Sequence, residues 1–191
     1  MIRGNLKIFA LEVVYIIGLL VMLILPLFSV KGYSVIRNTL SDLGAQHIPG
    51  GWIMNCIFVS LAICSVVAGW GFYKDFMLHR IALVLLGISL TLIAFFNHSP
   101  VNPDMQYNLM EDGLHAYFAS TGGLSFIILS IATSFILEKQ QDRVLAFAAG
   151  ISVVLLSLLM SEAIRYAGVW QRLIFLISFG WMIYNFKTRE S

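Results

Sequence analysis

The amino-acid sequence predicts an all-α membrane protein built as a bundle of six transmembrane helices. Of the 191 residues, 59% are apolar and only 12% are charged, and the mean hydropathy is +0.87. Soluble domains carry about 25% charged and about 45–50% apolar residues. A chain this apolar lacks the polar side chains to cover a soluble fold, whereas lipid solvates an apolar exterior. The apolar residues also fall into six separate stretches, most of them long enough to cross a bilayer.

The first three spans are predicted over residues 8–30, 52–72 and 81–96. The first is longer than the roughly 7–15-residue core of a signal peptide and lacks a small-residue cleavage site, so it is expected to stay in the protein. Pro26 should bend it, because proline removes a backbone donor. Trp52 opens the second span, where an amphipathic ring favours the membrane interface. The third span is shorter than the usual 17 or so residues and is expected to borrow flanking residues.

The last three spans are predicted over residues 114–137, 144–164 and 169–186. Small residues recur four apart on the first of them, which predicts close packing against a neighbouring helix. These residues are Ala116 with Ser120 and Ala119 with Gly123. The middles of all six spans hold few polar groups besides Ser, Thr and Gly, which argues against ion-coupled transport. The whole chain, residues 1–191, is therefore expected to form a single transmembrane domain.

Lysine and arginine are distributed unevenly between the two sides of this layout. Eight of the twelve lie on the side of the termini and four on the other. Because an excess of Lys and Arg marks the cytoplasmic side, we expect a multi-pass protein of the cell (inner or plasma) membrane with both termini cytoplasmic. The net charge of +2 and the absence of a basic patch exclude a nucleic-acid partner. The expected partner is membrane lipid, and the sequence says nothing about protein partners.

Unusual polar residues concentrate on the opposite, extracytoplasmic side. Ionisable groups at the level of the lipid head groups are costly unless they pair or line a wet cavity, so they are candidates for function. The candidate binding residues are Asn38, Asp42, Asn55, Asp112 and Arg172. Arg172 suits an anionic lipid head group, because guanidinium matches phosphate in a bidentate fork. We favour the alternative that Arg172 pairs with Asp42 or Glu162 and joins helices.

Four residues on that side are candidates for catalysis: Ser41, Asp42, His98 and His115. A nucleophilic serine needs a base within hydrogen-bond reach, and either histidine could supply it. No Gly-x-Ser-x-Gly motif surrounds Ser41. The simpler interpretation is that Ser41 or Asp42 forms a turn, because both side chains bond readily to nearby backbone.

The candidate metal ligands are Asp42, His98, Asp112 and His115. Two imidazoles with carboxylates suit zinc or another divalent ion. However, no compact motif such as His-Glu-x-x-His occurs, so a structural hydrogen-bond network is favoured over a metal site, and any cofactor remains unknown. One helical turn could align Glu111 or Asp112 with His115. Asp112 could also act simply as the N-cap of the fourth span.

Three segments resemble one family. They read Arg-Asn-Thr-Leu-Ser-Asp-Leu-Gly-Ala at residues 37–45, Pro-Gly-Gly-Trp-Ile-Met-Asn at 49–55 and Gly-Val-Trp-Gln-Arg-Leu at 168–173. Together with His115, they resemble the domain-of-unknown-function 998 family of six-span bacterial and archaeal membrane proteins. The resemblance implies six spans and a set of shared polar positions, but it implies no activity. These positions are Asn38, Ser41, Asp42, Asn55, His115 and Arg172. The chain departs from the Phe-Pro-x-Asp often found in the family after the third span, since it reads Phe-Asn-His-Ser-Pro at 96–100.

The leading functional expectation is recognition of a lipid or lipid-linked head group at the extracytoplasmic face, with chemical modification of that head group left open. The polar residues gather at head-group level while the midplane is poor in charge. One alternative is a non-catalytic scaffold or sensor whose polar residues only hold the helices together. A further alternative is a metal-dependent membrane hydrolase.

Overall fold

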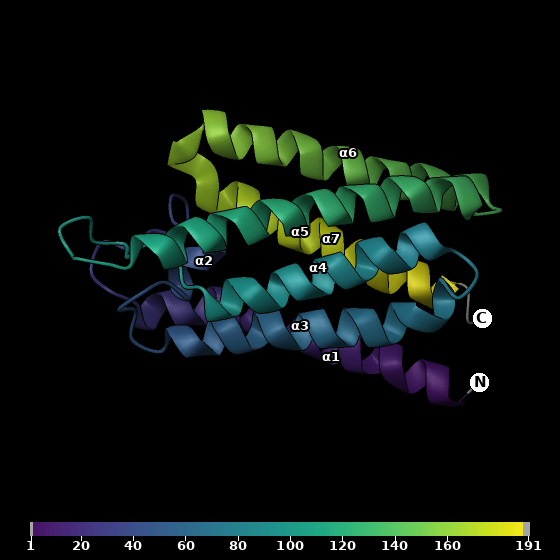
Figure 1. Ribbon diagram of the computed structural model, residues 1–191, viewed down its shortest axis with the longest axis horizontal. Helices are drawn as coiled ribbons and strands as arrows, with labels where there is room; N and C mark the ends of the chain where they lie inside the picture. Colours follow the sequence, from purple (N-terminus) through teal and green to yellow (C-terminus); the bar gives the residue numbers. More distant parts are fainter. Residues whose placement is uncertain (1, 189–191) are drawn as a thin grey trace.

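A computed structural model describes residues 2–188, and within them it confirms the all-α six-span architecture. Figure 1 shows an elongated bundle with both chain ends at the same end. The long helices are α1 (Ile2–Ile24), α3 (Gly51–Phe72), α4 (Met77–Phe95), α5 (Leu109–Ile136), α6 (Gln140–Glu162) and α7 (Ala167–Thr188). Each is long and apolar enough to cross a membrane, so the chain is a multi-pass membrane protein.

Four helices begin four or more residues earlier than hydropathy predicts, and one of them is α1, which begins at Ile2 instead of residue 8. α4 begins at Met77 instead of residue 81, α5 at Leu109 instead of 114, and α6 at Gln140 instead of 144. Their first turns contain polar residues, which a hydropathy pattern assigns to the connections even though the backbone there is helical. The N-cap of α5 is Asn108, whose side chain accepts from the backbone N–H groups of two following residues. The expectation that Asp112 caps this helix is therefore wrong, and Asp112 lies in its first turn.

The first span changes helix type instead of bending as one helix. α1 ends at Ile24 and continues as a 3-10 turn, η1 (Leu25–Phe28), with Pro26 in the first turn of that segment. The candidate span covers Leu6–Phe28, slightly earlier than the predicted 8–30. Proline lacks the N–H that an α-helical bond would need there, which explains the change.

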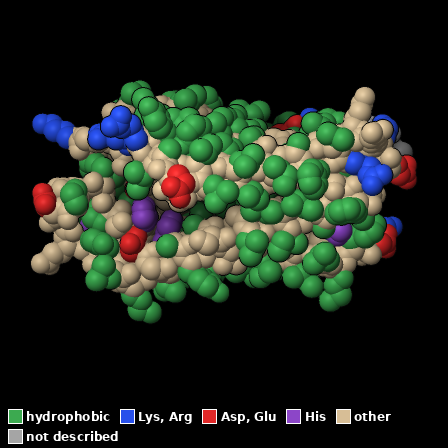
Figure 2. Space-filling model, turned by 90° about the horizontal axis from the view of Figure 1, so that it is seen from above, with side chains coloured by type: hydrophobic (Ala, Val, Ile, Leu, Met, Phe, Trp, Pro, Cys, Tyr) green, Lys and Arg blue, Asp and Glu red, His purple; other side chains and the backbone are tan. Residues whose placement is uncertain are grey.

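Helices that are consecutive in the chain pack side by side, and α7 returns to contact α1 and α3. The fully buried Leu11, Leu61, Leu83, Leu129 and Met182 come from five different helices and form a continuous core. The face seen in Figure 2 carries apolar side chains along its length. An exterior of this kind is what lipid solvates.

The two ends of the bundle differ. The termini end carries an ion pair between Lys187 and Glu12, and the guanidinium of Arg80 lies 4.5 Å from the centre of the Trp70 ring. Arg189, one of the residues behind the predicted orientation, lies outside the described residues. The opposite end, called the loop end below, carries three connections. These are residues 29–50 with the short helix α2 (Leu40–Leu43), residues 96–108, and residues 163–166 with the 3-10 turn η2 (Ile164–Tyr166).

The predicted close packing through small residues of α5 is wrong for Gly123. A side chain at Gly123 would meet nothing within 4 Å, and Ala119 and Ser120 are exposed. Close approach occurs at Gly150 of α6 instead, where an added Cβ would come within 2.6 Å of Ser130 Oγ. The exposed small residues Ala119, Ser120 and Gly123 thus leave room beside α5 instead of bringing another helix against it.

Candidate functional site

Helix α2 begins with a capping box that orients Asp42. Thr39 Oγ1 accepts from Asp42 N at 3.2 Å, and Asp42 Oδ2 accepts from Thr39 N at 2.6 Å. The same carboxylate oxygen also faces Thr39 Oγ1 at 3.0 Å and Asn38 Nδ2 at 3.4 Å. The Thr-x-x-Asp spacing suits this reciprocal arrangement. Oδ2 is therefore committed to holding the start of α2, which leaves Oδ1 to point elsewhere.

Gln171 of α7 ties α2 to the bundle. Its Oε1 accepts from Leu40 N and from Ser41 N, the latter at 3.4 Å. Its Nε2 donates to Ser41 Oγ, also at 3.4 Å. Hydrogen bonds between residues about 130 positions apart thus set where Ser41 and Asp42 sit. Sequence reasoning did not single out Gln171, although it stands beside Arg172 in the third of the resembling segments.

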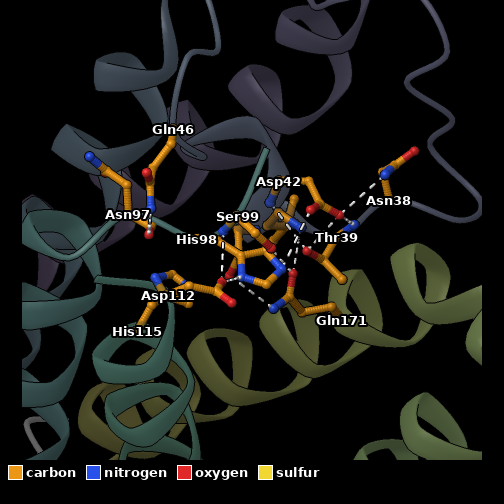
Figure 3. A network of polar contacts seen from close by, with 12 residues as sticks. Asn38, Thr39, Asp42, Gln46, Asn97, His98, Ser99, Asp112, His115 and Gln171 are labelled. Atoms are coloured by element: carbon orange, nitrogen blue, oxygen red, sulfur yellow. Dashed lines mark hydrogen bonds and ion pairs between the residues drawn. The ribbon is translucent and has the colours of Figure 1, made fainter. Parts of the chain in front are cut away.

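His98, just after α4, lies between two carboxylates (Figure 3). Its Nδ1 is 2.7 Å from Asp112 Oδ1, which also accepts from Ser99 N at 2.7 Å. Its Nε2 is 3.7 Å from Asp42 Oδ1, beyond ordinary hydrogen-bond length. An ionised carboxylate only accepts, so Nδ1 of His98 carries the proton that is shared with Asp112.

His115 of α5 stacks on His98, with ring centroids 5.2 Å apart and an interplanar angle of 25°. Its Nδ1 donates to the backbone carbonyls of Phe96 at 2.8 Å and Ile93 at 3.1 Å. The side chain is buried, and its Nε2 has no hydrogen-bond partner among the described residues. Asp42, His98, Asp112 and His115 are together called the polar cluster below. Neither Glu111 nor Asp112 pairs with His115, since Asp112 pairs with His98 instead.

Two amides hold the loops around the polar cluster. Gln46 Nε2 donates to the carbonyls of Asn97 and Asn108, each at 3.1 Å. Asn55 Nδ2 donates to Asn97 Oδ1 at 2.9 Å and to Gly44 O at 3.3 Å. An added Cβ at Gly44 would lie 2.1 Å from Asn55 Oδ1, so this contact requires glycine. Asn55, a candidate binding residue, is engaged in joining loops.

Arg172 pairs with neither Asp42 nor Glu162, so the favoured ion pair is wrong. Its Nη1 donates to the carbonyls of Val35 and Asn38, each at 2.9 Å, and to that of Gly168. Its Nη2 donates to the hydroxyl of Tyr33 at 2.9 Å. The expected joining role is nevertheless present, because these bonds fasten residues 33–38 to α7.

Two neighbours of Arg172 show how tightly this segment is held. An added Cβ at Gly168 would lie 2.3 Å from Asn38 O, so only glycine allows the segment to pass this close to α7. Burial raises the pKa of Tyr33, an effect that the Arg172 guanidinium opposes. The hydroxyl therefore stays protonated at neutral pH, and it faces the carbonyl of Thr39 at 3.0 Å.

A cavity of about 490 Å³ lies beside the polar cluster, between α4, α5, α6 and α7. Its walls are mostly apolar, and Ser41 and Gln171 line it at the loop end. Its lining includes exposed residues of two helices, Ala119 and Ser120 of α5 and Ser157 of α6, so it opens between these helices. Figure 2 shows a hollow on this face with histidine and carboxylate side chains beside it.

A family model described as "Protein of unknown function (DUF998)" matches residues 13–184. The chain belongs to this family. The match covers nearly the whole chain and confirms the family that the three segments resemble. Comparison with curated proteins and with solved structures finds no match.

In this DUF998 protein, tertiary structure brings together only part of the predicted site. The polar cluster unites four candidates. Asn38 and Ser41 lie at its edge: Asn38 bonds to Asp42 of the cluster, and Ser41 bonds to Gln171. Ser41 Oγ has Gln171 as its hydrogen-bond partner, and no histidine of the described residues bonds to it. Within residues 2–188, no three His, Cys, Asp or Glu side chains form a group that could hold a metal ion.

Proposed function

We propose that this DUF998 protein binds a membrane lipid, with an acyl chain in the cavity and the head group at the polar cluster. The observation that carries the proposal is that the two lie next to each other: Ser41 and Gln171 line the loop end of a mostly apolar cavity, and Asp42 of the polar cluster follows Ser41 directly in the chain. Its volume of about 490 Å³ falls within the roughly 300–1,000 Å³ of small-ligand pockets. An amphipathic ligand would match both surfaces.

The packing of α6 supports entry from the side, out of the lipid. The buried residues of α6 are Ala146, Ala149, Gly150 and Val153, and none of its last nine residues, 154–162 at the loop end, is buried. In Figure 1, α5 and α6 lie close together near the termini and separate toward the loop end. A lipid chain could therefore pass between them without leaving the membrane and without moving through water.

The orientation predicted from Lys and Arg completes the proposal. With the termini in the cytoplasm, the loop end and the polar cluster face the extracytoplasmic head groups. The ligand would then come from the outer leaflet of that membrane. The proposal covers binding and leaves out chemical modification of the lipid, because no hydrogen bond links Ser41, the candidate nucleophile, to a histidine that could act as its base.

Filling the cavity tests the proposal. Gly123→Leu places a side chain in open space that the acyl chain would occupy, whereas Gly71→Leu makes the same change in open space on α3, away from the cavity. Native mass spectrometry of gently purified protein should show bound lipid in the wild type and in Gly71→Leu, and little in Gly123→Leu. Equal lipid occupancy in all three proteins, or none in the wild type, would contradict lipid binding in this cavity.

One observation favours a second candidate, a scaffold whose polar cluster is purely structural. Asp42 Oδ2 caps α2, and the side chains of Gln46 and Asn55 bind the loops that surround the cluster. A scaffold predicts that substitutions in the polar cluster lower thermal stability in detergent and leave bound lipid unchanged. The same mass spectra therefore separate the two functions.

A further inference from the structure

Two hydrogen-bond donors stand at the mouth of the cavity, its loop end, where Ser41 and Gln171 line it. Gln171 Oε1 accepts from the backbone N–H groups of Leu40 and Ser41. Because only an oxygen can accept these bonds, the NH₂ group of Gln171 is the part that faces Ser41 Oγ, at 3.4 Å. This long contact occupies one of the two N–H groups. The other N–H and the hydroxyl proton of Ser41 have no acceptor among the described residues.

The position of these donors calls for an acceptor from outside the protein. Ser41 is only 7% exposed, so its hydroxyl has little access to bulk water. A donor that loses water without gaining another partner is destabilising. Ser120 also lines the cavity, but its hydroxyl donates to Ala116 O at 2.9 Å and needs nothing further. A ligand that fills the cavity should therefore place an acceptor beside Ser41 and Gln171.

The surroundings favour an uncharged acceptor. None of the described residues that line the cavity is Lys or Arg. The guanidinium of Arg172 is occupied by backbone carbonyls, and any positive charge on His98 faces the two carboxylates of Asp42 and Asp112. A phosphate or free carboxylate beside Ser41 would thus lie next to Asp42 without a cation of its own. A carbonyl oxygen carries no net charge, and its two lone pairs can accept both donors.

The length of the cavity places this acceptor at the start of an acyl chain. Along α7 the lining runs from Gln171 to Met182, which is about 16 Å at about 1.5 Å per residue. Half of a hydrocarbon core of about 30 Å is about 15 Å. A chain that begins beside Ser41 and fills the cavity would therefore end near the middle of the bilayer, as the chains of one leaflet do. In acyl lipids the group at the start of such a chain is an ester, which carries a carbonyl.

We infer that the mouth of the cavity recognises the ester carbonyl of an acyl lipid, which accepts hydrogen bonds from Ser41 Oγ and Gln171 Nε2. This inference rests on the proposed lipid binding and names the class of lipid: one with ester-linked acyl chains, as opposed to ether-linked alkyl chains. The parts of the ligand follow the order of the protein surfaces. The chain lies in the cavity, the ester beside Ser41 and Gln171, and the head group at the polar cluster.

Competition between two lipids that differ only in the carbonyl tests the inference. Diacyl phosphatidylglycerol and its dialkyl ether analogue share the head group, the chain length and the linking oxygen, but only the ester has C=O groups. Purified protein is incubated with an equimolar mixture, and bound lipid is measured by native mass spectrometry. Wild type should retain the ester lipid about tenfold over the ether lipid, a ratio in the range expected when two neutral hydrogen bonds are lost.

Two variants remove the donors separately. Ser41→Ala deletes the hydroxyl, whereas Gln171→Glu keeps an oxygen for the backbone of α2 and replaces the NH₂ donor with a second oxygen. Each should lower the preference to about threefold, and the charge that Gln171→Glu adds acts equally on two lipids with the same head group. Ser120→Ala is the matched control, because it removes a hydroxyl from the same cavity that is already bonded to Ala116 O. Thermal unfolding in detergent shows whether each variant is folded.

The outcomes separate this inference from the function on which it rests. Equal retention of the two lipids by the wild type, an unchanged ratio in both Ser41→Ala and Gln171→Glu, or an equal fall in Ser120→Ala would overturn the ester assignment, even if Gly123→Leu still loses lipid. Displacement of the ester lipid by an equal concentration of free fatty acid with the same chain would overturn the ester in favour of a carboxylate. No bound lipid in the wild type would overturn both the inference and the function.

Discussion

Replacing Arg172 should loosen the loop end without disturbing the six spans. Arg172→Met keeps an unbranched apolar stem but removes the donors to Val35 O, Asn38 O and the Tyr33 hydroxyl. Two backbone carbonyls of the 33–38 segment then lose their guanidinium donor. The cost of leaving a buried polar group unpaired is about 1–3 kcal/mol. Both carbonyls are only partly buried, and Asn38 O keeps the Tyr33 hydroxyl as a donor at 3.4 Å, so we expect a total loss of about 1–3 kcal/mol in the free energy of unfolding.

Thermal unfolding in detergent measures this loss. For a protein of about 150–250 residues, 1 kcal/mol corresponds to about 2–4 °C in Tm, so a loss of about 2 kcal/mol lowers Tm by about 4–8 °C. Arg172→Lys keeps the charge but lacks the planar guanidinium fork, so its Tm should lie between those of the wild type and Arg172→Met. Arg165→Met is the matched control, because Arg165 is an exposed cation at the same end.

Hydrogen exchange locates the effect within the molecule. Gly168 N and Val169 N donate to the carbonyls of Arg37 and Ile36, and these bonds depend on the segment that Arg172 holds. Both amides should exchange faster in Arg172→Met while amides in the middle of α3 keep their protection. A Tm within about 2 °C of the control variant, with unchanged exchange at these two amides, would refute the holding role.

Two further predictions concern pH and orientation. Burial raises the pKa of Tyr33 in the folded protein, so its protonated hydroxyl contributes stability below the ordinary tyrosine pKa of about 10, and this contribution is lost as pH rises through the folded-state pKa. In urea unfolding from pH 8 to 11, the free energy of unfolding should therefore fall less in Tyr33→Phe than in the wild type. An equal fall in the two proteins would contradict this. With Cys56 and Cys64 replaced by serine, a membrane-impermeant maleimide applied to intact cells should label Asp104→Cys at the loop end and spare Lys74→Cys at the termini end. The reverse labelling would invert the proposed topology.

Contacts that were predicted correctly and incorrectly differ in how far apart the two partners lie in the sequence. The interpretation that Asp42 bonds to nearby backbone is confirmed, because its partner Thr39 N is three positions away. The partners of Arg172 lie 134 and 137 positions away and are backbone carbonyls, which every residue possesses. No pattern of side chains marks which carbonyl will be near, so the expectation of a carboxylate partner was reasonable and wrong.

Gly123 shows the same limit for packing. A glycine four positions from an alanine is compatible with a neighbouring helix and with an open cavity, because the spacing describes one helix face and not what lies opposite. The choice depends on where α6 diverges from α5, and that follows from contacts nearer the termini, including the close approach of Gly150 to Ser130.

The sequence by itself determined the six spans and the family. A segment that crosses lipid must be a helix, because only a helix satisfies its own backbone hydrogen bonds there, and its side chains must be mostly apolar, so each span is visible as a continuous apolar stretch in the chain. It also determined that the unusual polar residues share one end of the bundle, since they lie in alternate connections. Only the tertiary structure decided which of them meet. His98 lies between Asp112 and Asp42, and Gln171, which lines the cavity, bonds to α2. Such side-chain contacts depend on how separate helices are placed, which no single segment of the sequence encodes.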